Sequence, residues 1–149
     1  MSIDWLDPKS KVSTNFTVKE CLWLPQWNRL ANEADGLNEA VKAELIATAA
    51  KMDELRDLLT IPIIIHCWFR PTEYNKLVGG AAKSAHLEGK AVDFHFKNWN
   101  CDEARKYFAG PDCRVLKHLE MRMEDLPGAN WIHLDTRAVP EGGNRIFKP

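Results

Sequence analysis

The stretch that decides the fold is Ser84-Ala85-His86-Leu87-Glu88-Gly89-Lys90-Ala91-Val92-Asp93. It contains a histidine and a carboxylate seven positions apart, with a glycine between them. From Lys90 to Phe96 bulky apolar residues alternate with small or polar ones, which predicts a strand. Asp93 then lies on the face opposite three bulky apolar side chains. A carboxylate buried there without a partner would be costly, so Asp93 needs one.

A metal ion would satisfy Asp93 and His86 together, because imidazole nitrogen and carboxylate oxygen both bind zinc at roughly 2.0–2.2 Å. A third ligand is available at His133, which interrupts the apolar stretch 131–135. Two histidines and one aspartate leave a coordination position for water, as catalytic zinc sites do. The alternative is a core histidine beside a salt-bridged aspartate, and spacing alone leaves both interpretations open.

Six short motifs occur in order within the segment from about Asn15 to Arg137. They are Arg70-Pro71-Thr72, Tyr74-Asn75, Val78-Gly79-Gly80-Ala81, Ser84-x-His86, Gly89-x-Ala91-x-Asp93 and Trp131-x-His133-x-Asp135. This set resembles the zinc D-alanyl-D-alanine carboxypeptidase family, which includes peptidoglycan-cleaving phage endolysins, the vancomycin-resistance dipeptidase and the hedgehog signalling domain. The resemblance implies a metallopeptidase whose partner is the peptidoglycan stem peptide. It also implies one Zn²⁺ per chain, held by His86, Asp93 and His133.

The same resemblance implies two substrate-facing residues. Arg70 follows the apolar strand predicted over 61–68, and its guanidinium can bind a carboxylate or an oxyanion bidentately. A purely structural pairing of Arg70 with Glu73 is the alternative. Ser84 precedes the first ligand by two residues, where the family uses a serine to contact substrate, although a serine there can equally cap a turn.

The general base departs from the family pattern. Active relatives place Glu or Asp three residues before the last histidine, or a histidine two residues before it, and here those positions are Asn130 and Trp131. We therefore expect Asn130 and Trp131 to contact substrate. Glu124 and Asp125 precede the His133 strand, and either is a candidate catalytic acid or base. Asp135 lies on the same strand face as His133, where it can orient that ligand.

Composition indicates one soluble domain over residues 1–149, with irregular ends at 1–14 and 139–149. Hydrophobic residues are 45% and charged residues 28%, which is ordinary for a globular protein, and the net charge of −1 gives no reason to expect nucleic acid binding. No apolar run predicts membrane insertion and none predicts a signal peptide, so we expect cytoplasmic synthesis. We also expect a monomer. The cysteines show no CxxC pairing and are expected as free thiols.

Local signals predict the elements around the site. Thr17 and Glu20 have capping-box spacing, and Asn38 should cap one long helix that carries an apolar stripe to Leu59. A β-branched strand over 61–68, apolar on both faces, is expected at the centre of the sheet. Pro71 should open a short helix, Asp102 should lie in the first turn of another, and residues 119–123 alternate as in a strand. The predicted fold class is α+β, with a small, mainly antiparallel sheet packed by helices, as in hedgehog and D-Ala-D-Ala peptidase domains.

Two functional hypotheses follow. The first is a zinc metallopeptidase that cuts peptidoglycan at a D-alanine-type bond as a carboxypeptidase or endopeptidase. With no signal peptide, we expect a phage or prophage lysis enzyme that reaches the wall after release. The second is a non-catalytic zinc-binding domain that recognises wall peptides or serves as a structural or virion component. The amide at Asn130 favours the second hypothesis, whereas Arg70 and Ser84 favour the first.

Overall fold

The computed structural model describes residues 2–149 and confirms the α+β class. Its helices are α1 (Val18–Leu22), α2 (Glu39–Leu59), α3 (Thr72–Leu77), α4 (Cys101–Ala109) and α5 (Arg114–Leu119), with 3-10 helices η1 (Glu33–Asp35) and η2 (Ala85–Glu88). Its strands are β1 (Trp23–Leu24), β2 (Arg29–Leu30), β3 (Ile63–Cys67), β4 (Ala91–Phe96), β5 (Arg122–Glu124), β6 (Ile132–Asp135) and β7 (Ile146–Phe147). No helix in this part of the chain is long and apolar enough to cross a membrane.

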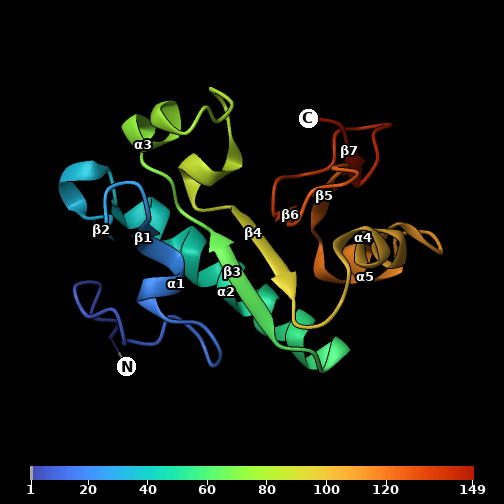
Figure 1. The fold of residues 1–149 in the computed structure, drawn as a ribbon, viewed down its shortest axis with the longest axis horizontal. Coiled ribbons are helices and arrows are strands. Elements are labelled where there is room, and N and C mark those ends of the chain that lie inside the picture. The colour runs from blue at the N-terminus through green and yellow to red at the C-terminus, as the bar shows by residue number, and fades with distance from the viewer. Residues whose placement is uncertain (1) are drawn as a thin grey trace.

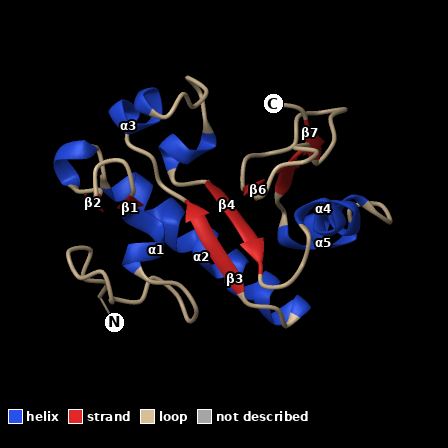
Figure 2. Cartoon of the chain, viewed as in Figure 1, coloured by secondary structure: helices blue, strands red, loops and turns tan. Residues whose placement is uncertain are grey.

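The long helix α2 forms where its cap and apolar stripe predict it. The Asn38 side chain accepts a hydrogen bond from the backbone N–H of Val41, which satisfies a donor that the first turn leaves free. Leu45 and Met52 on its inner face are fully buried. In Figures 1 and 2 this helix runs behind β3 and β4, so it covers one face of the sheet. The opposite face is left for polar side chains.

The main sheet has five strands in the order β3-β4-β6-β5-β7. All pairs are antiparallel except β5 with β7, which is parallel. The expectation that the 61–68 strand is central was wrong, because β3 pairs only with β4 and forms an edge. Its outward side chains are correspondingly exposed, Ile64 by 42%. Apolar residues on both faces thus did not indicate a central strand.

The region after α4 also differs from prediction. Leu119 was expected in a strand with Met123, but it ends helix α5, and Glu120 then adopts a left-handed conformation at φ 56°. The strand β5 begins only at Arg122. The C-terminal segment is not wholly irregular, since Ile146 and Phe147 form β7 against β5. The segment 28–38, which leads into α2, contains β2 and η1.

Candidate metal centre

Strand register places the functional side chains in one row across the sheet. Cys67 of β3 lies opposite Asp93 of β4, and Asp93 lies opposite His133 of β6. In the next pair of strands Arg122 is opposite Asp135 and Met123 is opposite Leu134. The same register brings Glu124 to His133, and its Oε2 lies 3.6 Å from His133 Nδ1. Residues far apart in sequence therefore meet because directly opposite residues in a sheet share a face.

His86 reaches this row from the short helix η2, outside the sheet. Ser84 Oγ accepts a hydrogen bond from the His86 backbone N–H, and Gly89 ends the helix at φ 76°. The His86 Nδ1 lies 2.6 Å from the Trp68 carbonyl oxygen. Because a carbonyl can only accept, Nδ1 carries the proton and Nε2 is left free to bind a cation.

The Nε2 atom of His86 is buried and makes no hydrogen bond within the described residues. It nevertheless lies 3.1 Å from Asp93 Oδ2, so the two atoms are close without being aligned for a hydrogen bond. A buried polar atom without a partner is costly. An ion shared by His86 Nε2 and the Asp93 carboxylate would remove that cost, which is the observation that fits a metal to this place.

His133 is held between two carboxylates. Its Nδ1 lies 2.9 Å from Asp93 Oδ1, and its Nε2 lies 3.2 Å from Asp135 Oδ2. Burial lowers the pKa of His133, but the hydrogen bonds to Asp135 and Asp93 outweigh it and raise that pKa to about 9. Burial raises the pKa of Asp93, yet His86 and His133 together hold it well below its usual range. A divalent cation could replace the proton on Nδ1 between His133 and Asp93.

The predicted ligands His86, Asp93 and His133 are therefore brought together around one carboxylate, and the donor set of two imidazoles and a carboxylate suits zinc. We call these three residues the metal centre. A further residue, Cys67, was not predicted from the sequence, and its ligand atom lies within 4.8 Å of those of His86 and Asp93. Burial, followed by the charge of Asp93, raises the pKa of the Cys67 thiol to about 12. Its position depends on a β-bulge between Ile65 and Cys67, which leaves no local sequence signal.

Arg70 lies beside the metal centre and does not pair with Glu73, which instead contacts Lys76 at 3.4 Å. Arg70 Nη2 donates to Ser84 Oγ at 3.2 Å, and its buried Nε makes no hydrogen bond within the described residues. The glycine at 80 makes room for this arrangement, because a Cβ there would lie 3.1 Å from Arg70 Nη1. Arg70 thus has donors free for a ligand, while Ser84 both caps η2 and orients Arg70.

The remaining predicted site residues lie further along the chain leading into β6. Asp125 contacts Lys148 at 3.6 Å and lines a separate cavity with Met123, on the face opposite Glu124. Asn130 is exposed at the rim of another cavity, and Trp131 is 38% exposed. Among the described residues, the ion pairs of His133 are with Asp93, Asp135 and Glu124.

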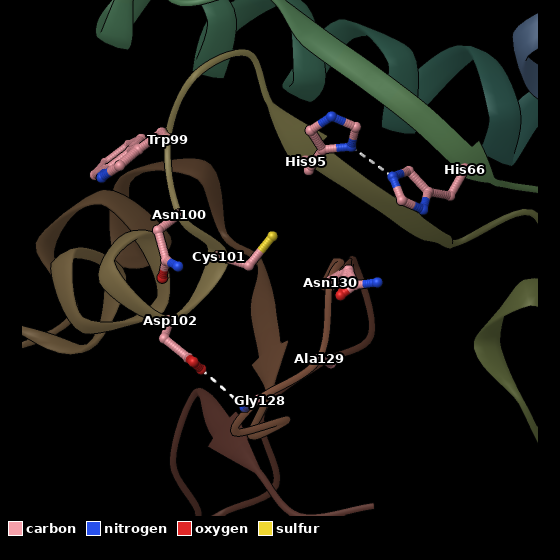
Figure 3. Close-up of a pocket in the computed structure, with 9 residues that line it drawn as sticks. All are labelled: His66, His95, Trp99, Asn100, Cys101, Asp102, Gly128, Ala129 and Asn130. Carbon is pink, nitrogen blue, oxygen red and sulfur yellow. Dashed lines mark hydrogen bonds between the residues drawn. The ribbon is translucent and has the colours of Figure 1, made fainter.

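A cavity of about 490 Å³ lies at the end of the sheet reached by His95 of β4, and no residue of the metal centre lines it (Figure 3). His95, two residues beyond Asp93 on the same face of β4, forms its upper wall together with His66, which it contacts. Asn130 faces the cavity from the loop before β6, and Asp102 accepts a hydrogen bond from the Gly128 backbone N–H at 2.9 Å across its floor. The full lining is His66, His95, Trp99, Asn100, Cys101, Asp102, Gly128, Ala129 and Asn130.

Comparison with known proteins agrees with this geometry. The model of the Peptidase M15 family matches residues 16–135, which include every residue of the metal centre, and the chain belongs to this family. No curated protein and no solved structure matches the chain. Membership makes the protein a hydrolytic peptidase from a family of zinc-dependent enzymes that act on peptidoglycan-type peptides.

Proposed function

We propose that this chain is a zinc peptidase that hydrolyses a D-alanine-type peptide bond in the peptidoglycan stem peptide, with Glu124 transferring the proton. The supporting observation is the position of Glu124, whose carboxylate lies 3.6 Å from the ligand nitrogen of His133. Glu124 is half-buried, and its strand holds it beside the metal centre. Asp125, the competing candidate, lines the cavity on the other face.

A zinc ion held by His86, Asp93 and His133 would supply Lewis-acid chemistry and a water of lowered pKa. Glu124 then accepts the proton from the attacking water and delivers it to the leaving amine. Arg70 directs its free donors at the charge that develops on the scissile carbonyl oxygen, or at a substrate carboxylate. Ser84 holds Arg70 through its Oγ. Asp135 holds the Nε2–H of His133, which would leave Nδ1 to bind the metal ion.

The cavity of Figure 3 supports a polar, extended substrate such as a stem peptide. Its wall carries amide, imidazole and carboxylate groups, with Trp99 as an apolar surface. His95 in its wall lies two residues beyond Asp93 on β4, so we propose that a peptide bound at the metal centre extends along β4 toward the cavity. Asn130 is placed to donate to or accept from that peptide, and Trp131 is exposed nearby in sequence for a further contact.

We also propose that the protein is a lysis enzyme of a phage or prophage, made in the cytoplasm and active on the wall after release, and that it acts as a monomer. Membership of a family that acts on peptidoglycan-type peptides supports action on the wall. The proposed role in lysis is tested by expressing the chain inside bacteria with and without a membrane-permeabilising agent. Lysis only after permeabilisation is the expected result, and lysis without it would contradict the proposal.

The reaction is tested by measuring new amino groups released from purified peptidoglycans of several chemotypes by the zinc-loaded protein. Glu124→Gln should lower release by about 10²–10⁴-fold while metal content stays the same. Glu103→Gln, which changes an exposed carboxylate of α4, is the matched control. If Asp125→Asn abolishes release and Glu124→Gln does not, the base is misassigned. If the parent binds the wall but releases nothing, the non-catalytic hypothesis is correct.

A further inference from the structure

We propose that the Cys67 thiol is a fourth protein ligand of the metal centre, beside His86, Asp93 and His133. The family pattern of two histidines and one aspartate leaves one coordination position to water, so a fourth protein ligand would change the centre. The metal-binding part of this inference stands on the side-chain geometry. Its consequence for the reaction rate rests on the proposed function.

The first observation is the bulge in β3. Ile65 pairs with Phe94 of β4, and the next pairing is Cys67 with Asp93, so two residues of β3 span one step of β4. A regular ladder would have placed His66 opposite Asp93. Bulges re-aim side chains in this way and are frequent beside active sites. The bulge therefore brings the Cys67 thiol opposite Asp93, while the His66 imidazole contacts His95 further along β4.

The second observation is the unsatisfied nitrogen of His86. This side chain is 1% exposed, and its Nε2 makes no hydrogen bond among the described residues. The adjoining residues Cys67 and Trp68 both face it: the Trp68 carbonyl fixes Nδ1, and Cys67 offers a sulfur among ligand atoms that lie within 4.8 Å of one another. Two atoms bonded to one zinc at roughly 2.0 and 2.3 Å can be at most roughly 4.3 Å apart. The ligand atoms of Cys67, His86 and Asp93 are therefore close to this limit or within it. His133 is not one of that group and joins it through Asp93, whose Oδ1 lies 2.9 Å from His133 Nδ1.

Binding would proceed by loss of the Cys67 proton to solvent, formation of the sulfur–metal bond and release of one water from the metal. The thiolate and the Asp93 carboxylate then balance the two positive charges of the ion. Thiolate is a soft ligand that favours zinc over magnesium or manganese. Because four protein ligands fill a tetrahedral site, hydrolysis would require the thiolate to be displaced, and removal of Cys67 should raise the rate.

Cobalt(II) substitution tests the ligand directly, because a thiolate bound to cobalt gives an intense charge-transfer band that nitrogen and oxygen ligands do not. The parent protein loaded with Co²⁺ should show this band, and Cys67→Ser should lose it. Cys113→Ser, which alters a half-buried thiol at the start of α5, should keep it. Zinc affinity of Cys67→Ser should fall by at least tenfold, since even outer partners of metal ligands cost about 10–100-fold.

A second measurement uses the parent protein alone and does not depend on the folding of a variant. Alkylation of each cysteine is followed by mass spectrometry with and without one equivalent of zinc. Zinc should protect Cys67 and leave Cys113 equally reactive. Equal modification of Cys67 in both samples would overturn the proposal.

The outcomes separate this inference from the proposed function. A cobalt spectrum that depends on His86 but lacks the charge-transfer band overturns Cys67 ligation, whether or not peptidoglycan is cleaved. A band that survives Cys67→Ser overturns it as well. A band lost in Cys67→Ser, with no release of amino groups by the parent or the variant, supports ligation and removes the proposed function.

Discussion

The Asp135 carboxylate is the partner of His133, and its replacement by asparagine tests how the metal centre is held. Asp135 is 1% exposed, and its carboxylate accepts four hydrogen bonds. Oδ1 accepts from Arg122 Nε at 2.8 Å and from the Arg137 backbone N–H at 3.2 Å. Oδ2 accepts from Arg122 Nη2 at 3.0 Å and from His133 Nε2 at 3.2 Å. In Asp135→Asn, either orientation of the amide turns its NH₂ group toward two of these donors.

The loss of folding stability follows from the number of donors that the amide leaves without an acceptor. Two hydrogen bonds are lost in either orientation, at least one of them to a charged group, and each bond to a charged group contributes about 1.5–3 kcal/mol. Breaking a buried ion pair by removing one charge costs about 3–5 kcal/mol, and Arg122 is 14% exposed, so its charge is poorly solvated. We therefore expect the metal-free variant to lose about 3–5 kcal/mol in its free energy of unfolding. Zinc affinity should fall by about 10–100-fold, because His133 is no longer oriented.

Urea denaturation in the presence of a chelator measures the loss of stability, and Asp125→Asn is the matched control. The Asp125 side chain is 44% exposed and its ion pair is with Lys148, whose side chain is 87% exposed, so the control should stay within about 0.5 kcal/mol of the parent. A loss below about 1 kcal/mol for Asp135→Asn would refute the reasoning, because it would mean that the four donors are satisfied without the carboxylate.

The difference in folding stability between the parent and Asp135→Asn should depend on pH. Burial raises the pKa of Asp135, but hydrogen bonds from His133 and Arg122 outweigh it, and the folded-state pKa is lowered. A lowered pKa contributes stability that is present above the unfolded-state value of about 3.9 and is lost as pH falls through the folded-state value. The difference between parent and Asp135→Asn should therefore be largest near neutral pH and narrow below about pH 4. A difference that grows in acid would contradict this sign.

Three further predictions use other parts of the molecule. Gly80→Ala would place a Cβ 2.0 Å from Asn75 Oδ1 and 3.1 Å from Arg70 Nη1. Because this would misplace Arg70, the rate of peptidoglycan cleavage should fall by up to about 10²-fold. Unchanged kinetics would argue against a role of Arg70 in binding substrate or stabilising the oxyanion. Leu45→Ala removes a fully buried side chain of α2 and should lower the free energy of unfolding by about 2–5 kcal/mol in urea; a cost near zero would mean that α2 does not pack as described. Saturating zinc at about 100 times its Kd should stabilise the parent by about 2.7 kcal/mol in thermal unfolding, and His86→Ala should remove that gain. Equal zinc stabilisation of His86→Ala would place the metal elsewhere.

Elements with local signals were predictable from the sequence. The Thr17 side chain accepts from the Glu20 backbone N–H, and the Glu20 carboxylate accepts from that of Thr17, as the capping-box spacing predicts. Asn38 caps α2 in the same way. These features depend on neighbours three residues apart. The helix α5 was missed because it has six residues and follows Asp112 and Cys113, both with positive φ, which no sequence pattern indicated.

Features that depend on strand order were less predictable. The apolar residues of β3 suggested a central position, but only the pairing of distant segments decides which strand forms an edge. The ligand set His86, Asp93 and His133 was expected from the sequence, and the structure brings the three side chains together: Asp93 and His133 face each other on β4 and β6, and His86 reaches them from η2. That they bind a metal ion stays a prediction. The β-bulge that presents Cys67 is a property of the β3–β4 ladder, so it appears only when both strands are in place.

The amide at Asn130 illustrates why distance along the chain was a poor guide to the proposed base. Three residues before His133 the chain is still in the loop that leads into β6, and Asn130 faces the cavity of Figure 3. The residue across the ladder from His133 is set by the β5–β6 register, which pairs Arg122 with Asp135 and Met123 with Leu134 and so brings up Glu124. A carboxylate placed by two paired strands keeps its distance from the ligand when the loop changes length or sequence. An amide at Asn130 is therefore compatible with proton transfer by this protein, because the proposed acid, Glu124, lies on the neighbouring strand.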